Sequence, residues 1–379
     1  MTSPPPVECS PLPSPAPPLI PSPDFRHLNI NPLELLERVR REEGRVLYAA
    51  APMVRYSKLA FRETVARVGG VDLVWTPMIL AKEFNRSALA RDSDFTLAPS
   101  PTPTIVQLGV NSPQEMHRST LLLAPHVNGI DINCGCPQSW ACAETLGAAL
   151  MHQPALVSAL VRSAKSALAS LGLQGRKTVS VKIRVHAAIH ETRAFVRAVE
   201  DAGVDFITVH GRTRSTPSSK PVDLDAIRAV KAAARVPVLA NGDVFTLADV
   251  RRVVEATGVD GVMSARGLLE DPGLFAHHHH HHHPHHPEPA APAAPAEPAA
   301  AEERRRRWKV LEHFVIQVIR APIPFKLVVH HLSEMGSSDR ERKGSLFSKE
   351  EKARLMECKT MLELLDWLDE LGDGREIRR

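Results

Sequence analysis

Aromatic residues are scarce in this sequence of 379 residues, at 4% of the chain, although hydrophobic residues make up 43%. Leu, Val, Ala and Ile must therefore fill the core, and the length allows two domains or one large barrel with an appendage. Cysteine is also rare: the five cysteines are Cys9, Cys134, Cys136, Cys142 and Cys358. An odd number, spread unevenly over a long chain, argues against a fold held together by disulfides.

Long apolar runs and a secretion signal are missing as well. No stretch is long enough to span a bilayer, so we expect no membrane association. The N-terminal segment lacks the basic-then-apolar order of a secretory signal. We expect a soluble monomer in the cytoplasm, with the nucleus as a second location. An excess of one charge is absent too: the net charge of +4 is compatible with a nucleic-acid partner but does not argue for one.

Two segments have compositions that do not support a hydrophobic core. Residues 1–24 are dominated by Pro and Ser, which predicts disorder. Residues 277–303 open with seven consecutive histidines, 277–283, and continue as a Pro/Ala/Glu tract, which predicts a flexible linker. Imidazole is a good metal ligand, so metal binding by this tract is the alternative. We favour the linker and predict no dedicated metal site.

Between these segments, residues 25–276 alternate strand and helix patterns. Helical periodicity marks segments such as 33–43, 57–67, 154–171, 191–202, 223–234 and 247–257. Short runs rich in Val and Ile, each ending in a polar residue or glycine, mark eight strands: 46–53, 71–78, 104–109, 129–135, 178–185, 206–211, 236–243 and 261–267. Eight such units predict a closed (β/α)8 TIM barrel. An open doubly wound sheet is the alternative, but no GxGxxG follows the first strand.

The rest of the chain, 304–379, has a different pattern. Amphipathic helical periodicity covers 308–319, 326–335 and 349–371. The predicted fold is therefore of the α/β class: a TIM barrel followed by a small all-helical C-terminal domain.

Reactive and polar residues recur where the predicted strands end, and this is where a barrel carries its active site. In chain order they are Ala51-Pro52-Met53-Val54, Gln107, Asn133-Cys134-Gly135-Cys136-Pro137, Lys182 with Arg184, His210-Gly211-Arg212, Asn241-Gly242-Asp243 and Ala265-Arg266-Gly267. A single polar ending has little meaning, but six or more together indicate a catalytic site.

The last two of these endings predict a phosphate site, because barrels often bind phosphate with the loops after strands seven and eight. The turn at 241–243 offers backbone N–H groups, and Arg266 adds a guanidinium. The alternative is that both glycines only terminate strands. Lys182 at a strand end is costly unless it meets an anion. His210 alone is typical of a hydrogen-bonded core histidine, but beside Lys182 we favour a functional role.

Cys136 lies between Gly135 and Pro137, on a loop that we expect over the barrel mouth. A free thiol has a pKa near ~8.5, so it is mostly protonated at neutral pH and can act as a general acid. Cys134 is expected to pack within the strand. As a metal site the Cys134–Cys136 pair is weak, since no histidine is near.

Together these residues resemble the tRNA-dihydrouridine synthase family. The motifs that carry the resemblance are 51–53, 133–137, Val181-Lys182-Ile183-Arg184, Val209-His210-Gly211-Arg212, 240–243 and 265–267, and they span residues 46–276 in order. The amino-acid sequences of segments 131–138 and 265–269 resemble those of the eukaryotic type-four branch of this family. That branch is associated with the adjacent D-loop uridines 20a and 20b.

The resemblance implies a bound FMN, with NADPH as transient reductant. It implies that FMN is held by Pro52, Met53, Val54, Gln107, Lys182, His210, Asn241, Gly242, Asp243, Ala265 and Arg266. It further implies that a hydride passes from flavin N5 to uracil C6 while Cys136 protonates C5. The partner is tRNA, whose target base must be extruded from a folded elbow. Asn133 and Arg184 are our candidates for the base edge, Arg212 and Arg214 for phosphate, and residues 304–379 for tRNA docking.

Two other functions stay open at this point. One is an FMN barrel oxidoreductase acting on a free pyrimidine, similar to dihydroorotate dehydrogenase. The other is a non-catalytic tRNA-binding protein on the same scaffold. A small-substrate enzyme needs no helical RNA-docking domain, and a binding protein would not depend on Cys136.

Overall fold

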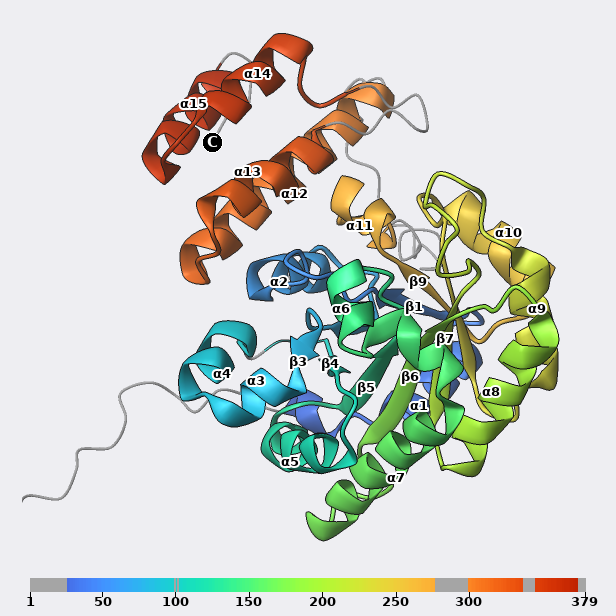
Figure 1. Cartoon of the computed structure of the whole chain (residues 1–379). Coiled ribbons are helices and arrows are strands. Elements are labelled where there is room, and N and C mark those ends of the chain that lie inside the picture. Colours follow the sequence, from blue (N-terminus) through green and yellow to red (C-terminus); the bar gives the residue numbers. More distant parts are fainter. Residues whose placement is uncertain (1–25, 99, 101, 277–298, 337–344, 374–379) are drawn as a thin grey trace, which may run out of the picture.

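The computed structural model describes residues 26–98, 100, 102–276, 299–336 and 345–373 (Figure 1). The disorder predicted for 1–24 and most of the linker predicted for 277–303, its histidines included, fall outside the described residues. The helix that follows begins at Ala299, five residues before the predicted boundary at 304.

All strand pairs in the described residues are parallel. The strands are β1 Leu47–Ala50, β2 Leu73–Trp75, β3 Ile79–Leu80, β4 Thr104–Gly109, β5 Gly129–Cys134, β6 Thr178–Arg184, β7 Phe206–His210, β8 Val238–Asn241 and β9 Gly261–Ser264. Their order is β2-β1-β9-β8-β7-β6-β5-β4-β3, and β2 also pairs with β4. This extra pairing closes the sheet, so the predicted barrel is confirmed and the open sheet is excluded.

The predicted second strand is divided in two. Val74 of β2 pairs with Thr104, and Ile79 of β3 pairs with Leu108, so both pieces lie along β4. Between them stands Pro77, which has no backbone N–H to donate to a neighbouring strand. β2 and β3 therefore share one of the eight positions around the barrel.

Helices surround the barrel, and most of them cover its outer face (Figure 1). They are α1 Pro32–Glu42, α2 Leu59–Val68, α3 Ala81–Arg86, α4 Ala88–Asp94, α5 Pro113–Leu123, α6 Ser139–Ala143, α7 Pro154–Ser170, α8 Ile189–Asp201, α9 Leu224–Ala233, α10 Leu247–Thr257 and α11 Arg266–Glu270. Local sequence sets several ends: Thr246 and Asp249 form a capping box at the start of α10, and Gly258 ends it in the left-handed conformation.

Strand residues alternate between two apolar cores. One face packs against the surrounding helices and includes Cys134, as expected from the sequence. The other fills the barrel interior, with Trp75, Phe206 and Met263 among its members. Leu36 and Val39 of α1 join this inner core and close the amino end of the barrel. Polar inward residues are therefore concentrated toward the carboxyl ends.

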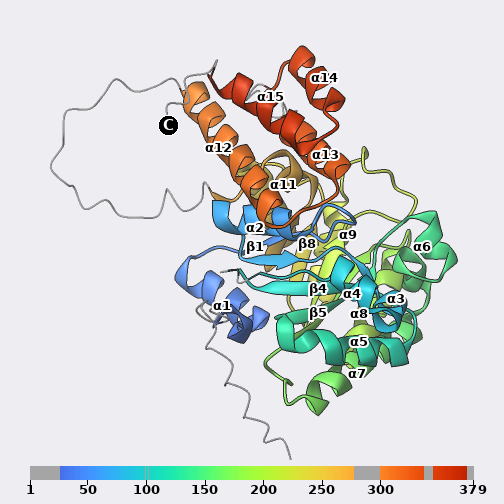
Figure 2. The same cartoon turned by 90° about the vertical axis from the view of Figure 1, so that its left-hand side faces the viewer.

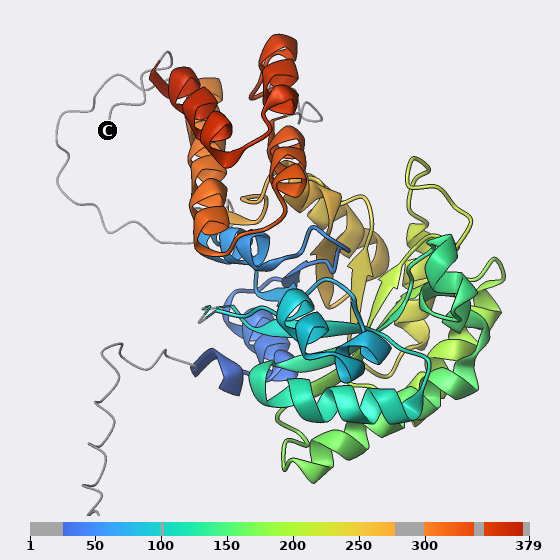
Figure 3. The same ribbon diagram turned by 60° about the vertical axis from the view of Figure 1, so that its left-hand side comes forward.

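The C-terminal helices form a second lobe beside the barrel (Figure 3). They are α12 Ala299–Arg320, α13 Phe325–Met335, α14 Lys349–Glu357 and α15 Met361–Asp373. The prediction of one helix over 349–371 was wrong, because the backbone leaves the helical conformation at Cys358 and α14 ends there. Thr360 then accepts the N–H of Glu363, whose carboxylate accepts the N–H of Lys359, and this capping pair starts a new helix. None of the helices in the described ranges is long and apolar enough to cross a membrane.

The helical lobe packs on the barrel through α2 and α11 (Figure 2). His331 of α13 is fully buried there, stacked on Phe61 at 5.1 Å between ring centroids and 4.8 Å from Phe314. Beside this aromatic cluster, Arg306 of α12 forms an ion pair of 2.6 Å with Asp271 at the end of α11. The lobe is thus fixed to the barrel beside the carboxyl ends of the strands.

Burial of His331 predicts that the fold loses stability in mild acid. Burial lowers its pKa to about 3, because a charged imidazolium would lose its hydration there. Below the ordinary histidine pKa of ~6.5 the unfolded chain takes up a proton that the folded chain does not. His331 therefore does not reduce the free energy of unfolding above that pH. As pH falls from there toward 3, the free energy of unfolding decreases by up to ~1.4 kcal/mol per pH unit.

Urea unfolding at pH 7.5 and 5.5 measures this loss. His331→Leu should make stability less dependent on pH, whereas replacement of the exposed His126 by alanine should not. Equal pH dependence in wild type and His331→Leu would contradict the assignment.

Candidate active site

Strand register brings the predicted site residues to one end of the barrel interior. Asn133 is level with Lys182 across β5 and β6, and one level further on Arg184, His210 and Asn241 are aligned across β6, β7 and β8. Neighbouring residues in a parallel register point to the same face of the sheet. These side chains therefore share the inner face, next to the carboxyl ends.

A polar layer lies directly below this level. Asp131 accepts a hydrogen bond from the Ser180 hydroxyl at 2.6 Å and one from Gln107 Nε2 at 2.7 Å. Gln107 Oε1 in turn accepts from Asn133 Nδ2 at 2.7 Å. All four side chains are buried, and burial raises the pKa of Asp131 to about 6. Asp131 and Ser180 were not among the predicted site residues, although alternate positions on a strand share a face, so Asn133 and Lys182 could have indicated them.

Asn133 holds the loop that carries Cys136. Its Oδ1 accepts the backbone N–H of Gly135 at 3.0 Å and that of Cys136 at 2.9 Å. Arg184 holds the same loop from the side: its Nε donates to the Gly135 carbonyl at 2.8 Å, and its Nη1 donates to the Thr213 carbonyl at 2.8 Å. Both residues thus fix the loop backbone, besides any role toward a substrate.

Cys136 itself is half-buried under the turn that follows α6. The Ala148 N–H donates to its carbonyl at 2.8 Å, and the Cys142 thiol lies 3.7 Å from the same oxygen. Gly147 is needed at this point, since its φ is +60° and a Cβ would collide with Cys136. Burial raises the pKa of the Cys136 thiol. The thiol is therefore protonated at neutral pH and able to act as an acid.

Lys182 is a cation without a partner at the centre of the site. Within the described part of the chain, its Nζ has no hydrogen bond or ion pair. Burial, followed by the charge of Arg184, lowers its pKa to about 8. A buried ammonium is costly unless an anion or an acceptor meets it. The site is therefore suited to an anionic ligand.

A cavity of about 70 Å³ opens at the ends of β7, β8 and β9. One water needs roughly 10–15 Å³, so the cavity has room for a phosphate group. Seven predicted residues line it: His210, Arg212, Asn241, Gly242, Asp243, Ala265 and Arg266. Gly242 and Asp243 have φ of +127° and +48°, and in the described chain their N–H groups donate to no backbone acceptor.

Arg212 is buried in the wall of this cavity. It donates to Asp243 at 2.6 Å and to the Lys220 carbonyl at 2.8 Å. Although burial alone would raise the pKa of Asp243, the hydrogen bond from Arg212 lowers it. Arg212 also donates to His210 Nε2 at 3.1 Å, which leaves the proton of a neutral imidazole on Nδ1. Burial and the nearby Lys182 lower the pKa of His210 to about 2, so this histidine stays neutral.

The loop after β1 brings Pro52, Met53 and Val54 to the same end of the barrel, each half-buried. Ser57 fixes it, accepting the Met53 N–H at 2.8 Å and donating to the Ala51 carbonyl at 2.9 Å. These three residues do not line the phosphate-sized cavity, and neither do Gln107 and Lys182. The predicted site therefore extends across the whole mouth.

A closed barrel with a protonated thiol, a lysine and a cavity at the carboxyl ends of its strands has the layout of a TIM-barrel enzyme. Residues 49–359 match the family described as dihydrouridine synthase, Dus. Similar proteins named tRNA-dihydrouridine(20a/20b) synthase, NAD(P)+, occur in two yeasts. The Saccharomyces cerevisiae protein is 37% identical over 355 residues, covering 93% of this chain and 87% of its own. The Schizosaccharomyces pombe protein is 39% identical over 326 residues, covering 86% and 88%.

The chain belongs to the dihydrouridine synthase family and is an oxidoreductase. A human protein whose name adds "-like" to the same title is 44% identical over 233 residues, 62% of this chain and 72% of its own.

Proposed function

We propose that this enzyme reduces the C5–C6 double bond of uridine in the tRNA D-loop to 5,6-dihydrouridine, at the adjacent positions 20a and 20b. Relatives that align over most of both chains carry this activity in their names. The observation that carries the proposal is the meeting of Cys136, the unpaired Lys182 and the phosphate-sized cavity at one end of the barrel.

The residues at the mouth fit a bound FMN. Asn241, Gly242, Asp243, Ala265 and Arg266 would hold its phosphate, since they line a cavity of suitable size. The N–H groups of Gly242 and Asp243, which donate to no backbone acceptor in the described chain, are available to the phosphate. Lys182, Gln107 and His210 would meet the polar edge of the ring, and Pro52, Met53 and Val54 its apolar face. NADPH would be the transient reductant.

Bound there and reduced by NADPH, FMN would supply a hydride for uracil C6. Cys136 supplies the proton for C5, because its thiol is held protonated by burial. Asn133 and Arg184 keep the Cys136 loop in place and would face the edge of the base. Arg212 would act behind the phosphate cradle, because its donors already meet Asp243 and His210.

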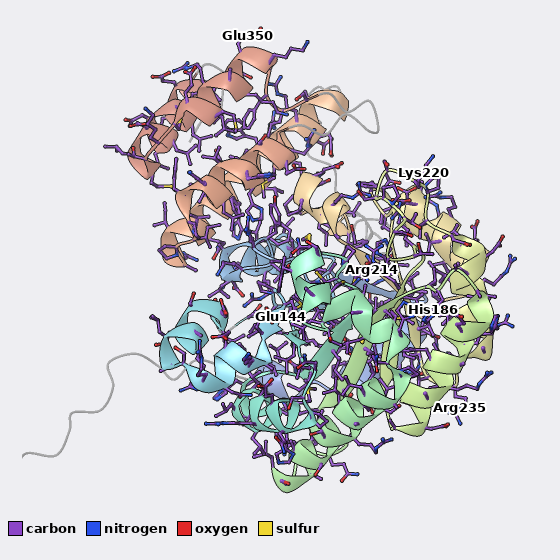
Figure 4. The ribbon with its side chains drawn as sticks, viewed as in Figure 1. Glu144, His186, Arg214, Lys220, Arg235 and Glu350 are labelled. Atoms are coloured by element: carbon purple, nitrogen blue, oxygen red, sulfur yellow. The ribbon has the colours of Figure 1, made fainter. Side chains whose placement is uncertain are left out.

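The helical lobe beside the mouth is the proposed docking surface for tRNA. Arg214 and Lys220 are exposed on the loop after β7, at the same end of the barrel (Figure 4). These two cations are our candidates for contact with tRNA phosphates. The Arg304–Arg307 run contributes less, because Arg306 pairs with Asp271 and Arg307 donates to the Met335 carbonyl.

Reoxidation of the reduced enzyme tests the choice of substrate. Purified protein is reduced with NADPH under anaerobic conditions, and the flavin absorbance is followed after each addition. We expect tRNA from cells that lack dihydrouridine to restore the oxidised spectrum, and free uridine or orotate to have no effect. Reoxidation by orotate alone would favour an oxidoreductase that acts on a free pyrimidine. If no substrate reoxidised the flavin, a non-catalytic tRNA-binding protein would be favoured.

A further inference from the structure

The buried polar layer has only one arrangement of its two amide groups. At the lower end, an ionised carboxylate can only accept hydrogen bonds, so Gln107 must turn Nε2 toward Asp131. At the upper end, backbone N–H groups can only donate, so Asn133 must turn Oδ1 toward Gly135 and Cys136. Gln107 Oε1 and Asn133 Nδ2 then face one another as acceptor and donor, as observed at 2.7 Å.

Asp131 therefore orients Gln107 from below, and Gln107 Oε1 in turn holds the Nδ2 of Asn133. Ser180 fixes the carboxylate by donating to its other oxygen at 2.6 Å. Asp131, Gln107, Asn133 and Ser180 lie on three adjacent strands, and none is more than 7% exposed, so solvent does not compete for these bonds. Rigid strands below thus support the loop that carries the thiol.

We propose that Asp131, held by Ser180, is a positioning residue for Cys136, acting through Gln107 and Asn133. The inference rests on the proposed role of Cys136 as proton donor. Asp131 does not touch the loop, so its effect depends on the amide orientations that it sets. Loss of its acceptor frees Gln107 to rotate, so Gln107 Oε1 no longer holds Asn133 Nδ2 and Asn133 is less firmly fixed beneath the two N–H groups.

Two substitutions of Asp131 distinguish its effect on the orientation of Gln107 from the effects of its negative charge and of its side-chain packing. Asp131→Leu keeps the branched shape and removes both acceptors. Asp131→Asn keeps one acceptor, which can face Gln107 while its NH2 group donates to the Ser180 hydroxyl, because a hydroxyl can accept as well as donate. The asparagine variant therefore retains the amide arrangement without the negative charge.

The expected results differ sharply between the two. Asp131→Leu should lower kcat for tRNA roughly 100-fold, the order of loss that a misplaced reacting group causes, with KM for tRNA unchanged. Asp131→Asn should stay within about threefold of wild type. Peptide-resolved alkylation of Cys136 by iodoacetamide, followed against pH, should differ from wild type in the leucine variant only.

Thr208→Val is the matched control. Thr208 lies level with Lys182 in the same interior, and its buried hydroxyl has no partner in the described chain. This variant should keep wild-type kcat and alkylation.

Two outcomes would overturn the proposal. Equal losses in Asp131→Leu and Asp131→Asn would mean that the charge matters rather than the orientation. An unchanged kcat and alkylation profile in a folded, flavin-loaded Asp131→Leu would mean that the layer does not act on the loop. Failure of the proposed function is distinguished by Cys136→Ala, which would then retain turnover whatever Asp131 does.

Discussion

Replacement of Cys136 by alanine is expected to lower turnover with tRNA by roughly 10²–10⁴-fold, the contribution of a positioned general acid. The thiol does not line the phosphate-sized cavity, whose lining residues lie at the ends of β7, β8 and β9 and on the segments that follow them. Flavin content and tRNA affinity should therefore stay at wild-type levels. Single-turnover product formation, with binding measured separately, shows whether the loss is confined to the chemical step.

Cys142→Ser is the matched control for this experiment. Cys142 lies on α6, with its thiol 3.7 Å from the Cys136 carbonyl, and serine keeps a donor there. Its turnover should stay within a few-fold of wild type. Equal product from Cys136→Ala and wild type would refute the assigned role.

The same assignment predicts how turnover depends on pH. Burial raises the pKa of Cys136, so the acid form persists through neutral pH into the alkaline range. We expect kcat to be flat near neutrality and to fall as pH rises through the raised pKa. A fall that begins below neutral pH would contradict a thiol donor.

Replacement of Lys182 by methionine is expected to stabilise the apoprotein and to weaken the binding of FMN. Lys182 is half-buried without a hydrogen bond or ion pair in the described chain, so removing its charge removes a desolvation cost and should raise apoprotein stability. A hydrogen bond to a charged group contributes about 1.5–3 kcal/mol, so FMN should bind about 10- to 100-fold more weakly. Thermal unfolding of the apoprotein and fluorescence titration with FMN measure the two effects.

Lys177→Met provides the comparison. Lys177 precedes the same strand at the opposite end of the barrel, and burial likewise lowers its pKa to about 8. Its ammonium donates to the Leu28 carbonyl at 2.5 Å, so methionine should destabilise the protein there without weakening FMN binding. If Lys182→Met binds FMN as wild type does, Lys182 is not the anion partner.

The sequence predicted those features that depend on local pattern. Buried strands in alternation with amphipathic helices predicted the barrel, because this order leaves few ways to cover both faces of a parallel sheet. Polar strand endings predicted the cavity-lining residues His210, Asn241 and Arg266, since strand ends meet at one rim of a barrel.

Features that depend on long-range contacts could not be predicted in the same way. Arg212 was expected to face RNA phosphate, but its guanidinium is buried against Asp243, 31 residues away. The partner of Arg212 is set by how two loops fold over one another, which strand periodicity does not specify. Thr360 and Glu363, by contrast, were a local signal for a new helix within 349–371 that hydrophobic periodicity concealed.

Position-resolved mapping of dihydrouridine tests the central claim most directly. The purified enzyme is incubated with NADPH and tRNA from cells that lack dihydrouridine, and each D-loop uridine is then assayed. We predict dihydrouridine at 20a and 20b with wild type, and little or none with Cys136→Ala under the same conditions. A flavin-loaded wild-type enzyme that forms no dihydrouridine at any position of the tRNA would contradict the proposed function.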